Sequence, residues 1–219
     1  MEDITIVFYT LNKPPKHWQE FHKKALLEAA GDSPVITLSK EPMDWGHNVV
    51  QTEPESMSNI YWQILKGCKL AKTPYVALVE DDTLYSKEHF AFRPPLDTVA
   101  FNHSRWAIFT WGEPFYFFKD WDANCTTIAP RDLMVEALEE RFAKYPVLPR
   151  TCAVGVGRVE KQLGLTRRKS LKFFTIEPVV CFHHKWSHNP AETQKKPKPL
   201  RAYDIPKWGR AEDLVKEFR

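Results

Sequence analysis

The chain has 219 residues, of which 43% are hydrophobic and 27% are charged, with a formal net charge of +3, which is ordinary for a globular protein with one sizeable core. Its four cysteines contain no C-x-x-C pair, which argues against a zinc knuckle or a dense disulfide framework and favours reduced, buried thiols. No window approaches the roughly 20 apolar residues of a membrane span, and the first ten residues lack a basic leader, so we expect a cytoplasmic protein with no membrane partner.

Strand and helix patterns alternate in the first 80 residues. Residues 4–10 are β-branched and apolar and predict a buried strand, and an apolar face at helical spacing predicts a helix over 17–31. A second strand follows at 34–39, then the clearest helix of the chain at 56–71, and then a strand at 75–79. This order predicts an α/β fold with a mostly parallel central sheet that is flanked by helices.

The second half of the chain is less regular. We expect two short strands, a helix and one late strand broken by Pro178, at 106–112, 114–118, 130–145 and 172–184. Beyond residue 188 a Pro- and Lys-rich segment is predicted to be loop until a short helix near Glu212. The predicted organisation is one domain over 1–188 followed by a basic extension over 189–219.

Three consecutive carboxylates, Glu80, Asp81 and Asp82, follow directly after the apolar strand at 75–79. In open α/β sheets ligands bind outside the carboxyl ends of the strands. Side chains alternate along an extended backbone, so Glu80 and Asp82 can reach one side together, and two convergent oxygens suit Mg²⁺ or Mn²⁺. The alternative is a solvated acidic turn without a ligand.

The order of these features resembles the GT-A fold of nucleotide-sugar glycosyltransferases, a single Rossmann-like domain whose D-x-D motif holds a metal and the donor diphosphate. Glu80-Asp81-Asp82 would be that motif, with Glu in place of the first Asp. The later stretches "VEKQLGL" and "KFFTIEPVVCFHH" are similar to a second signature of inverting members, an acidic residue, a Leu-containing helix, a Gly, a strand with Pro and a closing His. The resemblance spans roughly residues 4 to 188.

The resemblance implies a Mn²⁺- or Mg²⁺-dependent enzyme that uses a nucleotide-sugar donor, with a UDP-sugar favoured. The implied metal ligands are Asp82, Glu80 and one of the two adjacent histidines, His183 and His184. Neighbouring positions on a strand face opposite ways, so we expect only one histidine to bind metal and prefer His183. The structural alternative is a hydrogen-bonded histidine at the end of a strand.

The resemblance also implies a general base and a set of donor contacts. Glu160 is the predicted base, and Asp122 is the second candidate. The alternatives are a surface Glu160 paired with Lys161 or Arg158, and an Asp122 that caps a turn. The positions that correspond to donor contacts are Thr10, Asn12, Asn59, Glu80 and Asp81. The residues after the second strand, Ser39, Lys40 and Glu41, depart from the Asp-Gly-Ser turn common in the family, so the nucleobase stays open.

The charge of the C-terminal segment bears on the identity of the acceptor. From Lys185 to Arg219 nine Lys and Arg face five Asp and Glu, a pattern with interleaved aromatics that can contact phosphates and bases. In size and layout the chain is similar to small phage-type glycosyltransferases that modify hydroxymethylated pyrimidines in double-stranded DNA, which makes such DNA a candidate acceptor. A saccharide or protein hydroxyl is the alternative. A nucleotidyltransferase is disfavoured because residues 10–16 contain no glycine, and a non-catalytic nucleic-acid or carbohydrate binder stays open.

Overall fold

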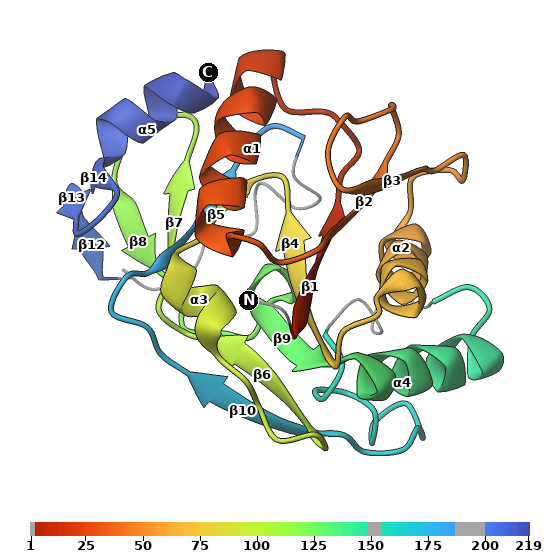
Figure 1. The fold of residues 1–219 in the computed structure, drawn as a ribbon. Coiled ribbons are helices and arrows are strands. Elements are labelled where there is room, and N and C mark those ends of the chain that lie inside the picture. Colours follow the sequence, from red (N-terminus) through yellow and green to blue (C-terminus); the bar gives the residue numbers. More distant parts are fainter. Residues whose placement is uncertain (1–2, 149–154, 187–199) are drawn as a thin grey trace.

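The computed structural model describes residues 3–148, 155–186 and 200–219. A seven-stranded sheet occupies its centre in the order β10-β6-β9-β4-β1-β2-β3 (Figure 1). Parallel pairings join β1 to β2 and β4, β2 to β3, and β6 to β10, while β9 is antiparallel to both of its neighbours. The strands are β1 Ile4–Tyr9, β2 Val35–Ser39, β3 His47–Val50, β4 Tyr75–Glu80, β6 Thr98–Asn102, β9 Thr127–Pro130 and β10 Lys169–Phe173. The predicted α/β fold with a mostly parallel central sheet is confirmed.

Helices cover both faces of this sheet (Figure 1). One face packs against α2 and α4, and the other packs against α1, α3 and a second sheet. Alternation along β1 produces this division, because Val7 and Tyr9 point toward α2 while Ile6 and Phe8 point toward α1. The helices are α1 Lys16–Ala30, α2 Met57–Leu70, α3 Lys87–Ala91, α4 Arg131–Lys144 and α5 Ala211–Phe218.

The close contact of α2 with β1 depends on a glycine. A Cβ atom built on Gly67 would lie 2.3 Å from Val7 Cγ1 and 3.0 Å from Leu38 Cδ1. A side chain at this position would therefore push the helix away from the strand. The apolar stripe of α2, which the sequence predicts well, continues on both sides of the glycine with Ile64 and Cys68.

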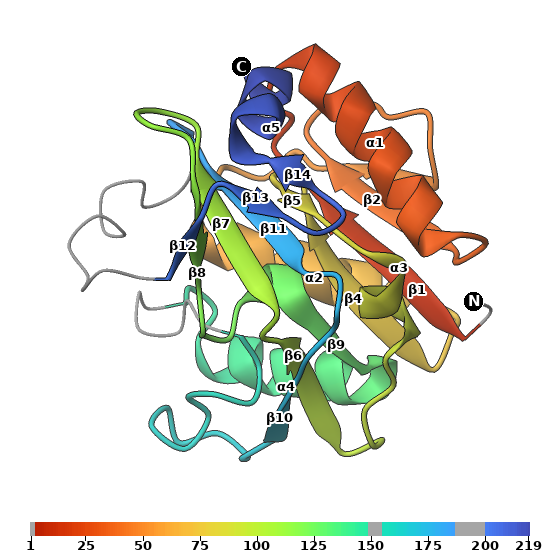
Figure 2. The same cartoon turned by 90° about the vertical axis from the view of Figure 1, so that its left-hand side faces the viewer.

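The second sheet has the order β12-β8-β7-β11-β5 and lies beside the first, with β7, β8 and β11 next to one another (Figure 2). Its strands are β5 Thr83–Leu84, β7 Arg105–Phe109, β8 Tyr116–Phe118, β11 Val179–His183 and β12 Arg201–Ala202. The prediction of one late strand over 172–184 is corrected here. The break at Pro178 separates β10 from β11, and the two strands belong to different sheets.

The C-terminal residues pack on the outer face of the second sheet. The hairpin of β13 Asp204–Ile205 and β14 Gly209–Arg210 leads into α5, which contributes Leu214, Val215 and Phe218 to a core around Trp18 of α1 (Figure 2). The predicted boundary at residue 188 lies outside the described residues, so the two-part organisation stays a prediction.

Two smaller predictions concern thiols and membranes. Cys68, Cys125 and Cys181 are free and buried, as expected, and Cys152 lies outside the described residues. Within the described ranges no helix combines the length and the apolar character needed to cross a bilayer.

Candidate active site

The three carboxylates line a cavity at the carboxyl edge of the central sheet. Its volume is about 280 Å³, and Glu80, Asp81 and Asp82 share it with the end of β1, the first turns of α2, and the segment after β11. The other lining residues with polar side chains are Tyr9, Thr10, Lys13, Glu55, Ser56, Asn59, Gln63, Asn124, His184 and Trp186. The cavity therefore lies where parallel α/β sheets bind their ligands.

Glu80 and Asp81 are each held by a hydroxyl group from β1 or the residue after it. Tyr9 Oη donates to Glu80 Oε1 at 2.7 Å, and Thr10 Oγ1 donates to Asp81 Oδ2. Burial, together with the neighbouring Asp82 carboxylate, raises the pKa of Glu80 to about 8 and that of Asp81 to about 7. In the described part of the chain neither carboxylate forms an ion pair with Lys or Arg. A cationic ligand would relieve this concentration of negative charge.

Asp82 has a histidine partner from the other end of the sequence. His184 Nε2 lies 3.2 Å from Asp82 Oδ2, although 102 residues separate the two in sequence. His184 Nδ1 accepts the backbone N–H of Trp186, so Nε2 carries the proton and donates to Asp82. Burial opposes ionisation of Asp82, but the hydrogen bond from His184 outweighs it and holds the pKa of Asp82 below its usual value.

The structure places His184 beside Asp82, although His183 is the histidine that the sequence favoured as a ligand. His183 lies elsewhere. Its Nε2 is 2.7 Å from Lys119 Nζ, and its ring lies beside Phe109 and Phe117. Burial and the nearby Lys119 charge lower the pKa of His183 to about 3, so its neutral ring accepts the ammonium proton. His183 is the last residue of β11, and the next residue turns toward Asp82.

The side chains at the cavity fit a metal site that substrate phosphates complete, and not a site in which protein side chains supply every ligand. Among the described residues no group of three or more His, Cys, Asp or Glu side chains is arranged to hold a metal ion. Asp82 Oδ2 and His184 Nε2 nevertheless lie 3.2 Å apart at the cavity, and Nε2 becomes a ligand atom when it gives up the proton that it donates to Asp82. Mg²⁺ and Mn²⁺ are commonly held by one or two side chains while substrate phosphates complete the shell. The residues present fit that arrangement.

The predicted donor contacts divide into two groups. Thr10 and Asn59 line the cavity together with Glu80 and Asp81. Asn12 does not: its Oδ1 accepts the backbone N–H groups of Lys40 and Glu41, which ties the segment after β1 to the segment after β2. Asn12 therefore shapes the rim of the site.

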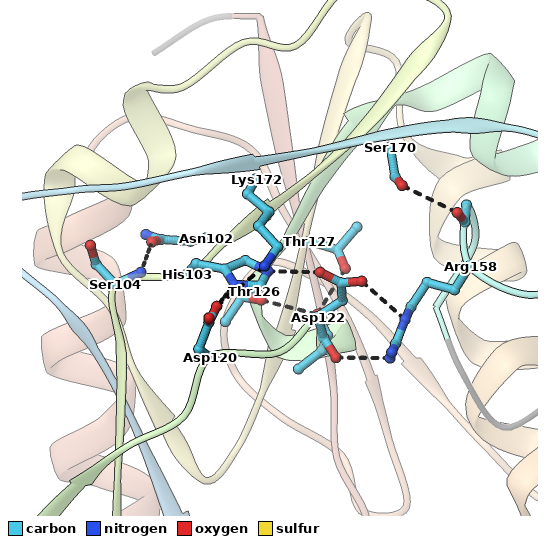
Figure 3. A network of polar contacts seen from close by, with 12 residues as sticks. Asn102, His103, Ser104, Asp120, Asp122, Thr126, Thr127, Arg158, Ser170 and Lys172 are labelled. Carbon is cyan, nitrogen blue, oxygen red and sulfur yellow. Dashed lines mark hydrogen bonds and ion pairs between the residues drawn. The ribbon is translucent and has the colours of Figure 1, made fainter. Parts of the chain in front are cut away.

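Asp122 belongs to a polar network that also includes His103, Asp120 and Arg158 (Figure 3). Its two carboxylate oxygens lie 2.7 Å from His103 Nε2 and 3.0 Å from Arg158 Nε. The other ring nitrogen of His103 contacts Asp120, so His103 lies between two carboxylates. The Asp122 side chain is 22% exposed and precedes by two residues Asn124, which lines the cavity. Asn124 begins the short 3₁₀ helix η1 (Asn124–Thr126).

Glu160 is buried in a different environment. Its Oε1 accepts hydrogen bonds from Arg141 Nη2 and from the Gly157 N–H, both at 2.9 Å. The Glu160 side chain is 4% exposed and that of Arg141 is 0% exposed. Glu160 does not line the cavity, and neither surface partner considered from the sequence, Lys161 or Arg158, is the one that pairs with it. Its catalytic role stays a prediction, and its contacts favour a structural one.

Several residues of the cavity escaped the sequence analysis, among them Tyr9, Gln63 and Trp186. Tyr9 is the last residue of a strand that reads as uniformly buried, and Trp186 gives no signal beyond its position after the histidines. Gln63 could have been found, because it interrupts the apolar stripe of α2 one turn after Asn59.

Comparisons with known proteins concern the fold. No protein-family model matches the chain, and a search of curated proteins finds no match either. A glycosyltransferase involved in the glycosylation of the major capsid of PBCV-1 is similar in structure, with 11% identity, a TM-score of 0.49, and coverage of 81% of this chain and 91% of that one. A nucleotidyl transferase from Methanothermobacter thermautotroptrophicus shows 16% identity and a TM-score of 0.40 over 64% and 76% of the two chains. The apo-form glycosyltransferase GlyE of Streptococcus pneumoniae shows 8% identity and a TM-score of 0.45 over 78% and 45%. These similarities concern the fold alone, so the proposed activity rests on the residues of the cavity.

Proposed function

We propose that the chain is a metal-dependent glycosyltransferase that moves a sugar from a nucleotide donor, with a UDP-sugar favoured, to an acceptor hydroxyl with inversion. The observation that carries the proposal is the meeting of Asp82 and His184 at the acidic cavity. Chain segments 102 residues apart bring Asp82 and His184 together, next to two carboxyl groups whose pKa values are raised by burial and by the nearby Asp82 carboxylate. A solvated acidic turn does not explain this convergence.

Several residues of the cavity then have a role in the proposed reaction. Asp82 and His184 would hold Mn²⁺ or Mg²⁺, which when bound neutralises the charge that develops on the departing diphosphate. Thr10 keeps the Asp81 carboxylate in place, and Tyr9 does the same for Glu80. Asn59 and Gln63 line the same cavity from α2.

We assign the general base to Asp122 in preference to Glu160. Its side chain is partly exposed and lies two residues before Asn124, which lines the cavity, whereas the Glu160 carboxylate is enclosed with Arg141. His103 and Arg158 fix the orientation of the Asp122 carboxylate, which is what a base needs to meet an acceptor hydroxyl on the side away from the leaving group.

Calorimetry with UDP and Mn²⁺ tests the proposal. We expect the wild-type protein to bind UDP only when Mn²⁺ is present, and Asp82→Asn to lose that metal-dependent binding because the substitution removes the charge beside the cation. Asp97→Asn is the matched control, since Asp97 is an exposed carboxylate paired with Lys169 and lies outside the cavity. Equal affinity for UDP with Mn²⁺ in all three proteins would show that the acidic triplet is a solvated turn without a ligand.

The acceptor is a separate part of the proposal, for which we retain hydroxymethylated DNA with a saccharide or protein hydroxyl as the alternative. Lys195, Lys196 and Lys198 lie outside the described residues. Of the described ones, Arg201 lies over the Phe115 ring at 4.3 Å, and the Tyr203 ring is 58% exposed. Gel shifts with hydroxymethylated and plain duplexes at about 50 and 200 mM salt test the idea, because contacts to phosphates weaken steeply over that range. A chain that shifts neither duplex and glycosylates neither has another acceptor.

A further inference from the structure

Two amide side chains of α2 are buried at the acidic cavity. Asn59 is 4% exposed and Gln63 is 2% exposed, and both line the cavity. They lie four residues apart on the helix and therefore on the same face. The same helix packs on β1 one turn further down, through Gly67 and Val7, so the two amides occupy the part of α2 nearest the sheet edge.

These amides have polar atoms without partners. Asn59 Oδ1 and Nδ2 and Gln63 Oε1 make no hydrogen bond in the structure. Asn48 shows the contrast, since its amide donates to the hydroxyls of Thr37 and Ser39 and accepts the Met43 N–H. Buried polar atoms are nearly always paired, because burial without a hydrogen bond is costly. A Leu or Met at either position would continue the apolar stripe of the helix without that cost, so the amides point to a ligand.

The free atoms restrict the chemistry of that ligand. Two carbonyl oxygens need hydrogen-bond donors, and one NH₂ group needs an acceptor. A phosphate oxygen only accepts and would leave both carbonyls unsatisfied, and the imide edge of a pyrimidine has a single N–H. A pair of neighbouring hydroxyl groups supplies two donors and also accepts, which satisfies all three atoms.

We propose that Asn59 and Gln63 form a diol-binding subsite that holds two adjacent hydroxyl groups of the nucleotide-sugar donor. The assignment rests on the proposed function and adds to it the group that this wall of the cavity recognises. The hydroxyls belong either to the ribose or to the transferred sugar, and the two sources share the same chemistry. The subsite discriminates against donors that lack one of these hydroxyls, because the missing group leaves a buried amide unpaired.

Calorimetry with Mn²⁺ and matched ligands tests the subsite. UDP and 2′-deoxy-UDP probe the ribose, and UDP-glucose and UDP-2-deoxyglucose probe the sugar. We expect the wild-type protein to prefer the full ligand of one pair by about 5- to 150-fold, the range that follows from leaving a buried group unsatisfied. Asn59→Leu and Gln63→Met keep the shape of the side chains, and we expect each to reduce that preference to about twofold or less. The pair that shows the preference identifies the source of the hydroxyls.

Thermal unfolding separates a binding role from a structural one. Asn59→Leu and Gln63→Met are expected to unfold at the wild-type temperature or above it, because they replace unpartnered amides with apolar groups of similar shape. Asn48→Leu is the matched control, and it should lower the unfolding temperature and leave the ligand preference intact, since its amide is fully bonded outside the cavity.

The failures are distinguishable. If the wild-type protein binds no nucleotide in the presence of Mn²⁺, the proposed function fails and the subsite fails with it. If the wild-type protein binds UDP or UDP-glucose and shows no preference in either pair, or if both variants keep the wild-type preference, the subsite alone is overturned.

Discussion

The ion pair of Glu160 with Arg141 leads to the expectation that Glu160→Gln lowers the free energy of unfolding and leaves turnover intact. The pair is enclosed, with 4% and 0% exposed side chains, and Glu160 Oε1 accepts two hydrogen bonds at 2.9 Å. A glutamine leaves the Arg141 charge inside the protein without the carboxylate. Breaking a buried pair in this way costs about 3–5 kcal/mol. For a chain of this size each 1 kcal/mol shifts the unfolding temperature by about 2–4 °C, so we expect it to fall by about 6–20 °C.

Urea unfolding followed by tryptophan fluorescence measures the loss of stability, and turnover is compared at a temperature where both proteins are folded. Glu139→Gln is the matched control, because the Glu139–Lys69 pair is 52% and 50% exposed and should contribute less than about 1 kcal/mol. The double variant Glu160→Met/Arg141→Leu removes both charges and should be more stable than Glu160→Gln. An unchanged urea midpoint together with a fall in turnover of about 10²- to 10⁴-fold would refute this reasoning and make Glu160 the base.

Three further outcomes follow from the structure. Asp122→Asn should lower turnover by about 10²- to 10⁴-fold while UDP affinity is kept, and an active variant would exclude Asp122 as the base. His89 is fully buried, and burial lowers its pKa to about 3. The unfolded state therefore takes up a proton at this histidine more readily than the folded state, so stability is lost as the pH falls below about 6.5. Between about pH 7 and pH 5 this loss amounts to about 2 kcal/mol, and urea unfolding of His89→Leu should show a pH dependence that is weaker by that amount. Gly67→Ala should destabilise the protein by about 1–3 kcal/mol because the new methyl group meets Val7, and a midpoint equal to wild type would show that α2 can move away from β1 without cost.

Most elements of the first 80 residues could be predicted because they have a local signal, and the exception is the short edge strand β3, His47–Val50. β1 and β4 are apolar runs bounded by turn residues, and α2 has a continuous apolar stripe. β7 and β8 correspond to the strands expected at 106–112 and 114–118, but the second sheet to which they belong could not be predicted in the same way. β5 and β12 have two residues each, and β11 pairs with β5 and β7 over separations of 70 residues or more. Pairings of this kind depend on the tertiary fold and leave no periodicity in the sequence.

The sequence carries information about the position of the candidate site only where residue chemistry and a strand end coincide. The acidic triplet follows a core strand, so its place at the sheet edge could be expected, and a histidine near it followed from the family resemblance. The choice between His183 and His184 depended on where β11 ends, and element boundaries are poorly specified by sequence. The environment of Glu160 depended on Arg141, which lies on a different element 19 residues earlier.

The measurement that tests the central claim most directly is the slow hydrolysis of nucleotide sugars without an acceptor. A panel of nucleotide sugars is incubated with the protein and Mn²⁺, and release of the nucleoside diphosphate is followed by mass spectrometry. We expect release from at least one donor, UDP-sugars first, and we expect it to stop when Mn²⁺ is chelated or when Asp82 is replaced by Asn. Release that continues unchanged in Asp82→Asn, or no release and no Mn²⁺-dependent binding for any donor in the panel, would contradict the assignment of the Asp82–His184 edge as the site of sugar transfer.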